Sequence, residues 1–421
     1  DYGHSQSQDE VDDGTNIKVS VRVRPFTARE AAKECKCCVS MKGNEVTLKN
    51  DAKRDQRHFR FDNCYWSHDR SHPDYASQET VFNDLGVFAL SNAFEGYNVC
   101  LFAYGQTGSG KSFSMVGSED DPGIIPRVAD ALFDYIEARR ADQNAAFEVL
   151  VSMIEIYNER IRDLLCPRTS GGGGGGRELR VREHPKAGPY VEGLSTLPAA
   201  GRAEMRRLLG AGSGARSIAS TTMNDVSSRA HTILCIRFTQ TTVDDLDSGM
   251  ARETKKVSQI NLVDLAGSER QSTKVQSAAE QARFREGIAI NKSLSTLSNC
   301  IFALYRQSKE RAPGGKDSGQ VHVPYRDSVL TWLLKESLGG NAKTVMLATV
   351  SPADINVEES LSTLQYAQRA KRVRTRAVVN EDTNDRIIRE LRAEIERLRQ
   401  QVAGQGVMSE ADRDVQRLRQ E

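Results

Sequence analysis

The sequence lacks a long hydrophobic run and an excess of either charge. Its longest apolar stretches, at residues 149–157 and 345–350, have the length of β-strands, whereas a membrane-spanning helix needs about 18 apolar residues in a row. The 58 basic and 57 acidic residues give a formal net charge of +1. We therefore expect no transmembrane segment and no nucleic-acid partner, although a neutral sum can hide a basic face.

The sequence also has no complete zinc motif and no visible signal peptide. The eight cysteines include the cluster Cys35, Cys37 and Cys38, but no second Cys-x-x-Cys or paired histidine completes a tetrahedral site. Structural thiols are therefore favoured over zinc ligands. Without a secretory signal, the cysteines indicate a reducing intracellular compartment.

The composition is that of an ordinary soluble protein, with 38% apolar and 27% charged residues. A length of 421 residues allows roughly two to three domains, or one large domain with an appendage. Helical patterns, as in residues 81–94, alternate with strand patterns, and residues 26–77 read as loop-rich. The strand patterns lie at residues 17–23, 99–104, 147–157 and 233–241. This alternation predicts an α/β fold with a mixed central sheet flanked by helices.

The two ends of the chain differ from the middle. Residues 1–15 are polar and acidic and are expected to form a flexible tail. Near the C-terminus, hydrophobic residues spaced 3-4-3-4 favour weak coiled-coil pairing, and hence a possible homodimer through residues 388–402, over a lone amphipathic helix. These residues are Ile388, Leu391, Ile395, Leu398 and Val402. We expect a helix at 385–403, then a hinge and the start of a further helix at 404–421.

A phosphate-binding loop is the clearest local motif. Residues 105–112 match GxxxxGK[ST], follow an apolar strand and precede a helical pattern, which favours a nucleotide site over a simple glycine-rich turn. In such a loop backbone N–H groups surround the phosphates, Lys111 reaches the β- and γ-phosphates, and the Ser112 hydroxyl coordinates Mg²⁺. The loop residues are Gly105, Gln106, Thr107, Gly108, Ser109, Gly110, Lys111 and Ser112.

A second motif, DLAG, closes an apolar strand at residues 264–267. Alone it could be any strand-to-loop turn, but beside a phosphate-binding loop Asp264 suits a water-mediated Mg²⁺ ligand. Gly267 lets the backbone approach the γ-phosphate. Guanine recognition needs an NKxD element, and the Asn-Lys pair at residues 291–292 is followed by Ser-Leu. ATP is therefore favoured over GTP.

A third motif, NDVSSR at residues 224–229, brings two hydroxyls and a guanidinium together. Ser227 and Ser228 could hold Mg²⁺, the γ-phosphate or the attacking water, and Arg229 could pair with Glu269. A helix cap followed by a surface arginine is the alternative interpretation.

Together with the strand RVRP at residues 22–25, these motifs resemble the kinesin motor domain from about residue 16 to 380. The strings FAYGQTGSGKS, NDVSSRAH and LVDLAGSER are highly specific. LRVREHPKAGPYVEGL and VVNEDTNDRIIREL resemble the kinesin-3, organelle-transporting group. The resemblance implies a P-loop NTPase-type sheet at residues 16–374, a microtubule-stimulated ATPase, plus-end-directed movement, and a cytoplasmic place on the microtubule cytoskeleton.

The resemblance also implies roles at the nucleotide. Arg22 and Pro25 would flank the adenine with Phe113 beside its ring, and Arg24 and Asn224 would belong to the same binding set. Mg²⁺ would be held by Ser112, Ser228 and Asp264. Residues 224–229 become switch I and 264–269 switch II, and closure of Arg229 onto Glu269 would position the attacking water. The implied catalytic residues are Ser227, Ser228, Arg229, Gly267 and Glu269.

The resemblance has further implications for microtubule binding and for the neck linker. A helix beginning near residues 288–291 would face the microtubule, and residues 375–384 would be a neck linker latched by Asn380. Tubulin is acidic, so a basic face is expected, and cargo would bind outside this chain. The candidate tubulin contacts are Lys292, Lys309, Arg311, Arg326 and Lys335. A non-motile, ATP-switched microtubule-binding protein is the alternative function.

Three departures from the kinesin-3 pattern stand out. The loop at residues 309–319 carries three basic and two acidic residues, so it lacks a lysine run and predicts a modest track-binding patch. Residues 275–283 contain no glycine, which predicts a helix-prone segment. Ala230 stands where serine is usual after the switch I arginine.

Overall fold

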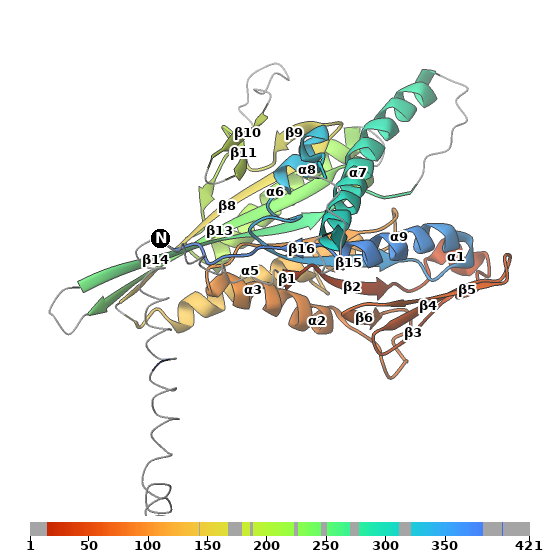
Figure 1. The fold of residues 1–421 in the computed structure, drawn as a ribbon, viewed down its shortest axis with the longest axis horizontal. Helices are drawn as coiled ribbons and strands as arrows, with labels where there is room; N and C mark the ends of the chain where they lie inside the picture. Colours follow the sequence, from red (N-terminus) through yellow and green to blue (C-terminus); the bar gives the residue numbers. More distant parts are fainter. Residues whose placement is uncertain are drawn as a thin grey trace, which may run out of the picture.

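The computed structural model describes residues 15–142, 144–166, 179–185, 188–222, 226–245, 251–269, 278–310, 321–381 and 398. Within them, a nine-stranded sheet forms the centre, in the order β12-β8-β13-β14-β7-β15-β2-β6, with β9 beside β8 (Figure 1). Its strands are β2 (Lys18–Val23), β6 (Asn63–Trp66), β7 (Val99–Tyr104), β8 (Ala145–Tyr157), β9 (Arg160–Asp163), β12 (Leu197–Pro198), β13 (His231–Asp245), β14 (Ala251–Asp264) and β15 (Lys343–Val350). The predicted α/β class is confirmed.

The sheet is mixed in direction. Strands β14, β7, β15, β2 and β6 pair in parallel, and β13 pairs antiparallel with both β8 and β14. In a parallel sheet the functional loops gather at the carboxyl ends of the strands. The ends of β7 and β14 are therefore adjacent, with Asp264 directly opposite Ala103.

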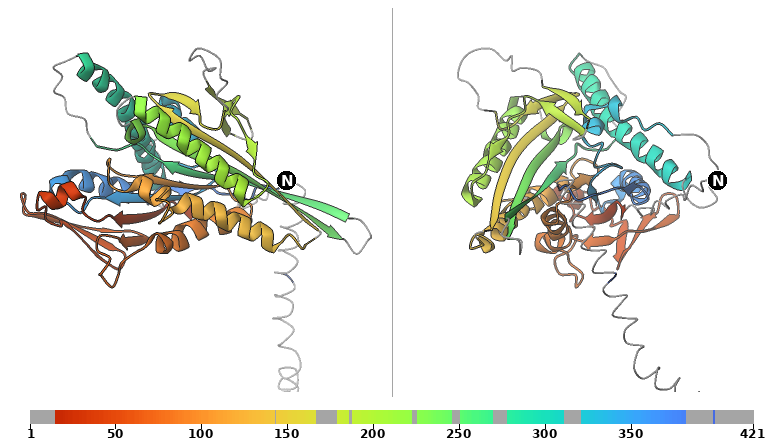
Figure 2. Two further views of the ribbon diagram at one scale, coloured as in Figure 1. Left: turned by 180° about the vertical axis from the view of Figure 1, so that it is seen from behind. Right: turned by 60° about the vertical axis from the view of Figure 1, so that its left-hand side comes forward.

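Helices cover both faces of the sheet, because the side chains of β7 are apolar on both faces and must be buried on each. Cys100, Phe102 and Tyr104 enter one hydrophobic cluster, while Val99, Leu101 and Ala103 enter the other. The first cluster includes residues of α7, α8 and α9, and the second includes residues of α3, α5 and α6. Figure 2 shows α6 and α7 on opposite sides of the sheet.

The helices differ widely in length, and none of those described is long and apolar enough to cross a membrane. Their bounds are α1 (Ala28–Ala32), α2 (Gln78–Val81), α3 (Val87–Phe94), α4 (Lys111–Met115), α5 (Ile124–Ala138), α6 (Arg202–Thr222), α7 (Ala278–Glu310), α8 (Val329–Leu333) and α9 (Val357–Ala370). A π-helical turn, η1 (Phe82–Gly86), joins α2 to α3, so the predicted helical stretch at 81–94 forms with one irregularity.

The interpretation of residues 26–77 as loop-rich was wrong. They hold α1, β6 and a small antiparallel sheet of β3 (Val39–Lys42), β4 (Glu45–Asn50) and β5 (Asp55–Arg60). These strands are short and only alternate residues are buried, Val46 and Leu48 on β4 and Phe59 on β5, so their pattern is weak in the sequence. A separate hairpin pairs β10 (Arg180–His184) with β11 (Gly188–Glu192).

The helix expected near residues 288–291 begins well before that, because α7 starts at Ala278. This early start lies in the glycine-free segment at 275–283 and agrees with its predicted helix propensity. Several segments fall outside the described residues. They are the acidic tail at 1–14, the run of six glycines at 171–176, the loop at 312–319, and the expected neck helix at 385–403 apart from Leu398.

Candidate functional site

The phosphate-binding loop lies between the end of β7 and the start of α4, as predicted. Gly105 has a φ of +153°, and a Cβ there would lie 2.2 Å from the carbonyl oxygen of Thr349, so no side chain fits. The carbonyl groups of Gly105 and Gln106 accept hydrogen bonds of 2.8 Å from Lys111 Nζ. The loop therefore orients this ammonium group beneath its own backbone.

Lys111 is buried, and burial lowers the pKa of its ammonium group to about 8, although Asp264 and Glu269 act to raise it. A desolvated cation is stabilised by a negatively charged partner. The phosphates of a nucleotide are such a partner, which fits the role predicted for this lysine.

This lowered pKa predicts a pH dependence of nucleotide binding. A bound phosphate favours the charged lysine, so binding is accompanied by proton uptake once the pH exceeds about 8. Nucleotide affinity, measured by titration with a fluorescent analogue, should be constant from about pH 6.5 to 7.5 and fall roughly tenfold by pH 9. The fall should disappear in Lys111→Ala; a slope that persists there would assign it to another group.

The Mg²⁺ ligands predicted at the ends of β7 and β14 do meet. Ser112 Oγ donates to Asp264 Oδ2 at 2.6 Å, and Asp264 Oδ1 is buried and has no hydrogen-bond partner among the described residues. A hydroxyl beside a buried carboxylate with a spare oxygen is a donor set that suits Mg²⁺. Arg216 on α6 lies 3.2 Å from the same Asp264 oxygen. This arginine could not be predicted from the sequence, because its contact comes only from tertiary packing.

Switch II lies against the phosphate-binding loop. Ser268 N–H donates to the Gly105 carbonyl at 3.1 Å, and Gly267 N–H donates to the Ser228 carbonyl at 3.0 Å. The Glu269 carboxylate accepts from the backbone N–H of Thr107 at 2.7 Å and from its hydroxyl. The three predicted motifs are thus brought together.

Several contacts predicted for switch I stay predictions. Glu269 is held here by Thr107, and closure of Arg229 onto Glu269 stays a prediction. Asn224 lies outside the described residues, as does the side chain of Ser227, although its backbone belongs to η2 (Val226–Arg229). Ser228 contributes its carbonyl to Gly267 and also lines the pocket described next.

A pocket of about 420 Å³ opens beside the phosphate-binding loop. Phe113, whose ring is exposed, and Pro25 both line it, as expected for an adenine site. Arg24 also lines it, but its guanidinium makes a bidentate pair with Glu30 at 2.6 and 2.7 Å. The hydrogen bond from Arg24 lowers the pKa of Glu30 to about 2, so this pair is charged at neutral pH.

Arg22 is not among the residues that line this pocket, and its place beside the adenine stays a prediction. Its guanidinium is buried and donates to Ser67, Gln78 and Ser114 at 2.9, 2.6 and 3.0 Å. Burial lowers its pKa to about 10. Because the guanidinium lies 5.4 Å from the centre of the Phe113 ring, Arg22 supports that ring from behind by a cation–π contact.

His231, the last residue of the string NDVSSRAH, is buried, and the sequence alone did not indicate a role for it. Its Nδ1 accepts from the Ala266 N–H at 3.0 Å, so the proton is on Nε2, which donates to Ser293 Oγ at 2.7 Å. Burial lowers the pKa of the imidazole to about 3, and the ring is neutral at physiological pH. It joins the end of switch I, the DLAG turn and helix α7.

A family model described as the kinesin motor domain matches residues 22–373. The chain belongs to the kinesin motor family. This confirms the resemblance drawn from the three motifs, and the fold described above is the kinesin motor fold.

Curated relatives agree on the subfamily. Kinesin-like protein KIF1C of Homo sapiens is 48% identical over 404 residues, which cover 94% of this chain and 35% of the relative. Kinesin-like protein KIF16B of Mus musculus is 50% identical over 394 residues, covering 91% and 29%. Both are kinesin-3 members, so the predicted subfamily is confirmed. The chain spans about a third or less of the length of these relatives.

Solved structures share the fold. A KIF14 dimer in a two-heads-bound state, with AMP-PNP and in complex with a microtubule, matches with a TM-score of 0.79 and 46% identity, covering 90% of this chain and 100% of that chain. The structure of a fast kinesin matches with a TM-score of 0.72 and 35% identity, covering 87% and 94%.

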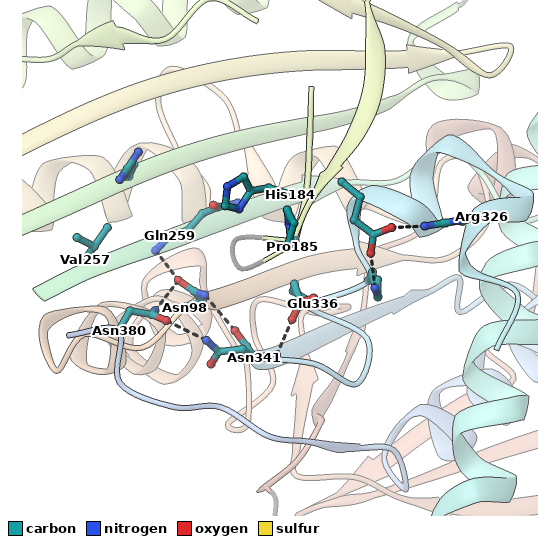
Figure 3. Close-up of a pocket in the computed structure, with 13 residues that line it drawn as sticks. Asn98, His184, Pro185, Val257, Gln259, Arg326, Glu336, Asn341 and Asn380 are labelled. Carbon is teal, nitrogen blue, oxygen red and sulfur yellow. Dashed lines mark hydrogen bonds and ion pairs between the residues drawn. The ribbon is translucent and has the colours of Figure 1, made fainter. Parts of the chain in front are cut away.

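The segment predicted as the neck linker of this kinesin motor domain lies along the core. Its first residue, Thr375, belongs to β16 (Arg374–Thr375), which pairs with β1 (Thr15–Asn16). Further on, Asn380 N–H donates to the Gly96 carbonyl and its own carbonyl accepts from Val257 N–H, both at 3.0 Å. The Asn380 side chain donates to Asn98 and accepts from Asn341, each at 2.9 Å (Figure 3).

The candidate tubulin contacts are only partly described. Lys292 is exposed on α7, while Arg311 and the side chain of Lys309 lie outside the described residues. Arg326, in η3 (Tyr325–Asp327), and Lys335 lie together, because both pair with Glu183 of β10. A pocket of about 630 Å³ separates this group from the Asn380 contacts (Figure 3).

Proposed function

We propose that this chain is an ATP-driven microtubule motor that moves toward the plus end. The main support is that Lys111, the Ser112–Asp264 pair and switch II meet at the phosphate-binding loop. In the same chain, the predicted linker is hydrogen-bonded to the core through Asn380. The complexes of KIF14 with microtubules support the choice of track.

Hydrolysis in such a site depends on positioning and charge, because the transferred phosphoryl group needs little covalent chemistry. Lys111 would neutralise charge on the phosphates, and Phe113 and Pro25 would hold the adenine. Ser112 would bind Mg²⁺ and Asp264 would hold it through water; bound Mg²⁺ neutralises charge on the phosphates. Gly267 offers its backbone, and Arg229 with Glu269 would order the water.

Conversion of hydrolysis into movement would use the contacts between elements. Switch II is joined through Ala266 and His231 to Ser293 on α7, so a displacement at Gly267 acts on the helix assigned to the track. The linker at 375–384 would dock along β14 and direct the next step. Pairing through residues 388–402 would provide a dimer, and cargo such as a vesicle or organelle would bind outside this chain in the cytoplasm.

Gliding of polarity-marked microtubules over the immobilised protein tests the proposal. Plus-end-directed motor activity moves each microtubule with its minus end leading, and ATPase turnover should rise with microtubule concentration. Turnover stimulated by microtubules without gliding, in both this chain and a forced dimer, would instead support the non-motile, ATP-switched alternative. The Asn380 contacts favour movement, because a passive switch needs no linker bound to its core.

Asn380→Ala should slow gliding severalfold while leaving most of the microtubule-stimulated ATPase. The substitution removes the side-chain hydrogen bonds to Asn98 and Asn341, and a hydrogen bond of this kind contributes about 0.5–1.5 kcal/mol to the docked state. Asn144→Ala, at an exposed turn residue just before β8, is the control. Equal gliding speeds for both variants would show that these contacts do not drive movement.

A further inference from the structure

The Glu183 carboxylate pairs with two of the candidate tubulin contacts, Arg326 and Lys335. Glu183 Oε1 accepts from Lys335 Nζ at 2.5 Å, and Oε2 pairs with Arg326. Glu183 comes from the hairpin β10–β11, whereas its two partners flank α8, so the contact joins segments far apart in the sequence. The side chains of Arg326, Lys335 and Glu183 are 72%, 38% and 24% exposed.

The three side chains face solvent as a group with a net charge of +1, since two cations share one carboxylate. The hydrogen bonds from Lys335 and Arg326 lower the pKa of Glu183 to about 2, and the carboxylate stays ionised throughout the physiological range. Other charges lie close in sequence: Asp327 follows Arg326, and Glu336 follows Lys335. The Arg326 guanidinium also lies 5.4 Å from the Trp332 ring, which fixes its direction further.

A partner with an acidic surface would meet these cations already paired. The partner's carboxylates could pair with Arg326 or Lys335 only by sharing these cations with Glu183 or by displacing Glu183. The negative charge of Glu183 would also repel the partner's carboxylates. Charges at the rim of an interface change the rate of association and its salt dependence.

We propose that Glu183 limits the affinity of this motor for the microtubule by competing with tubulin carboxylates for Arg326 and Lys335. The inference rests on the proposed function, since it takes the acidic tubulin surface as the partner. Competition by Glu183 would be a second reason, besides the missing lysine run at 309–319, for weak electrostatic attraction to the microtubule.

Glu183→Gln tests this directly, because it keeps the size of the side chain and removes the charge. The microtubule concentration for half-maximal ATPase, and the dissociation constant from cosedimentation with AMP-PNP, should both fall about three- to tenfold, within the range of a few weak ion pairs. The gain should shrink as salt is raised.

Glu192→Gln is the matched control. Glu192 is on the same hairpin, its side chain is 44% exposed and it pairs with Arg182 at 3.2 Å, so the charge change is the same without contact to Arg326 or Lys335. Its affinity should stay within about twofold of wild type. Adding Arg326→Ala to Glu183→Gln should cancel most of the gain.

Two results would overturn the inference while leaving the proposed function intact. Unchanged or weaker binding by Glu183→Gln would mean that Glu183 only positions the two cations, and an equal gain in Glu192→Gln would mean a general effect of charge. Absence of microtubule stimulation in the wild-type chain would instead refute the proposed function. Melting temperature and basal ATPase should match in wild type, Glu183→Gln and Glu192→Gln, since these two substitutions lie outside the nucleotide site.

Discussion

Lys111→Ala should lower ATP turnover at least about a hundredfold, with and without microtubules. The variant removes the buried ammonium group that the Gly105 and Gln106 carbonyls orient, and no other cation of the described residues lies at that position under the loop. Charge on the β- and γ-phosphates would then be left without its protein partner. Steady-state phosphate release and binding of a fluorescent nucleotide measure the loss.

Lys53→Ala is the matched control for this prediction. Lys53 follows β4, and its exposed side chain pairs with Glu358 of α9 at 2.6 Å, away from the nucleotide site, so the same truncation there should leave turnover within about twofold. Retained microtubule-stimulated turnover in Lys111→Ala would refute the assignment of the nucleotide site to residues 105–112.

The local parts of this site could be predicted because their residues are contiguous. The loop at 105–112 carries its glycines, lysine and serine in one string, and the apolar run before it required a buried strand. The junction of this loop with Asp264 could also be expected, since both follow strands that end at one edge of a parallel sheet. The 2.6 Å contact of Ser112 with Asp264 follows from that topology.

The partners of buried arginines could not be predicted in the same way. Arg22 is held by Ser67, Gln78 and Ser114, which are 45, 56 and 92 residues away, and no periodic pattern links them. The strand pattern at residues 17–23 agrees with the burial of Val21 and Val23, but it could not indicate that the Arg22 side chain between them would enter a polar network. Arg216 presents the same difficulty, because only packing brings α6 to Asp264.

Gly267→Ala should permit nucleotide binding but lower hydrolysis at least about a hundredfold, an effect of the size seen when a transition-state contact is lost. An ideal Cβ at this position would lie 2.1 Å from Thr107 Oγ1 and 2.4 Å from Glu269 Oε2. The contact between the phosphate-binding loop and switch II would therefore have to open, and the Gly267 N–H would lose its present alignment with Ser228. The clash does not involve Lys111 or the Gly105 and Gln106 carbonyls that orient it, which is why binding should survive.

Stopped-flow binding of a fluorescent ATP analogue, followed by single-turnover phosphate release, separates these two steps. Gly210→Ala is the control, since a Cβ there on helix α6 meets nothing within 4 Å, and alanine in an exposed helix is expected to stabilise it by about 0.5–1 kcal/mol. Normal phosphate release in Gly267→Ala would show that switch II can shift without harm, and the close approach of Gly267 to Thr107 would then have no part in hydrolysis. If nucleotide binding and hydrolysis were reduced equally, Gly267 would instead be needed to form the phosphate-binding loop. The contact of Gly267 with Glu269 predicts a loss of turnover alone.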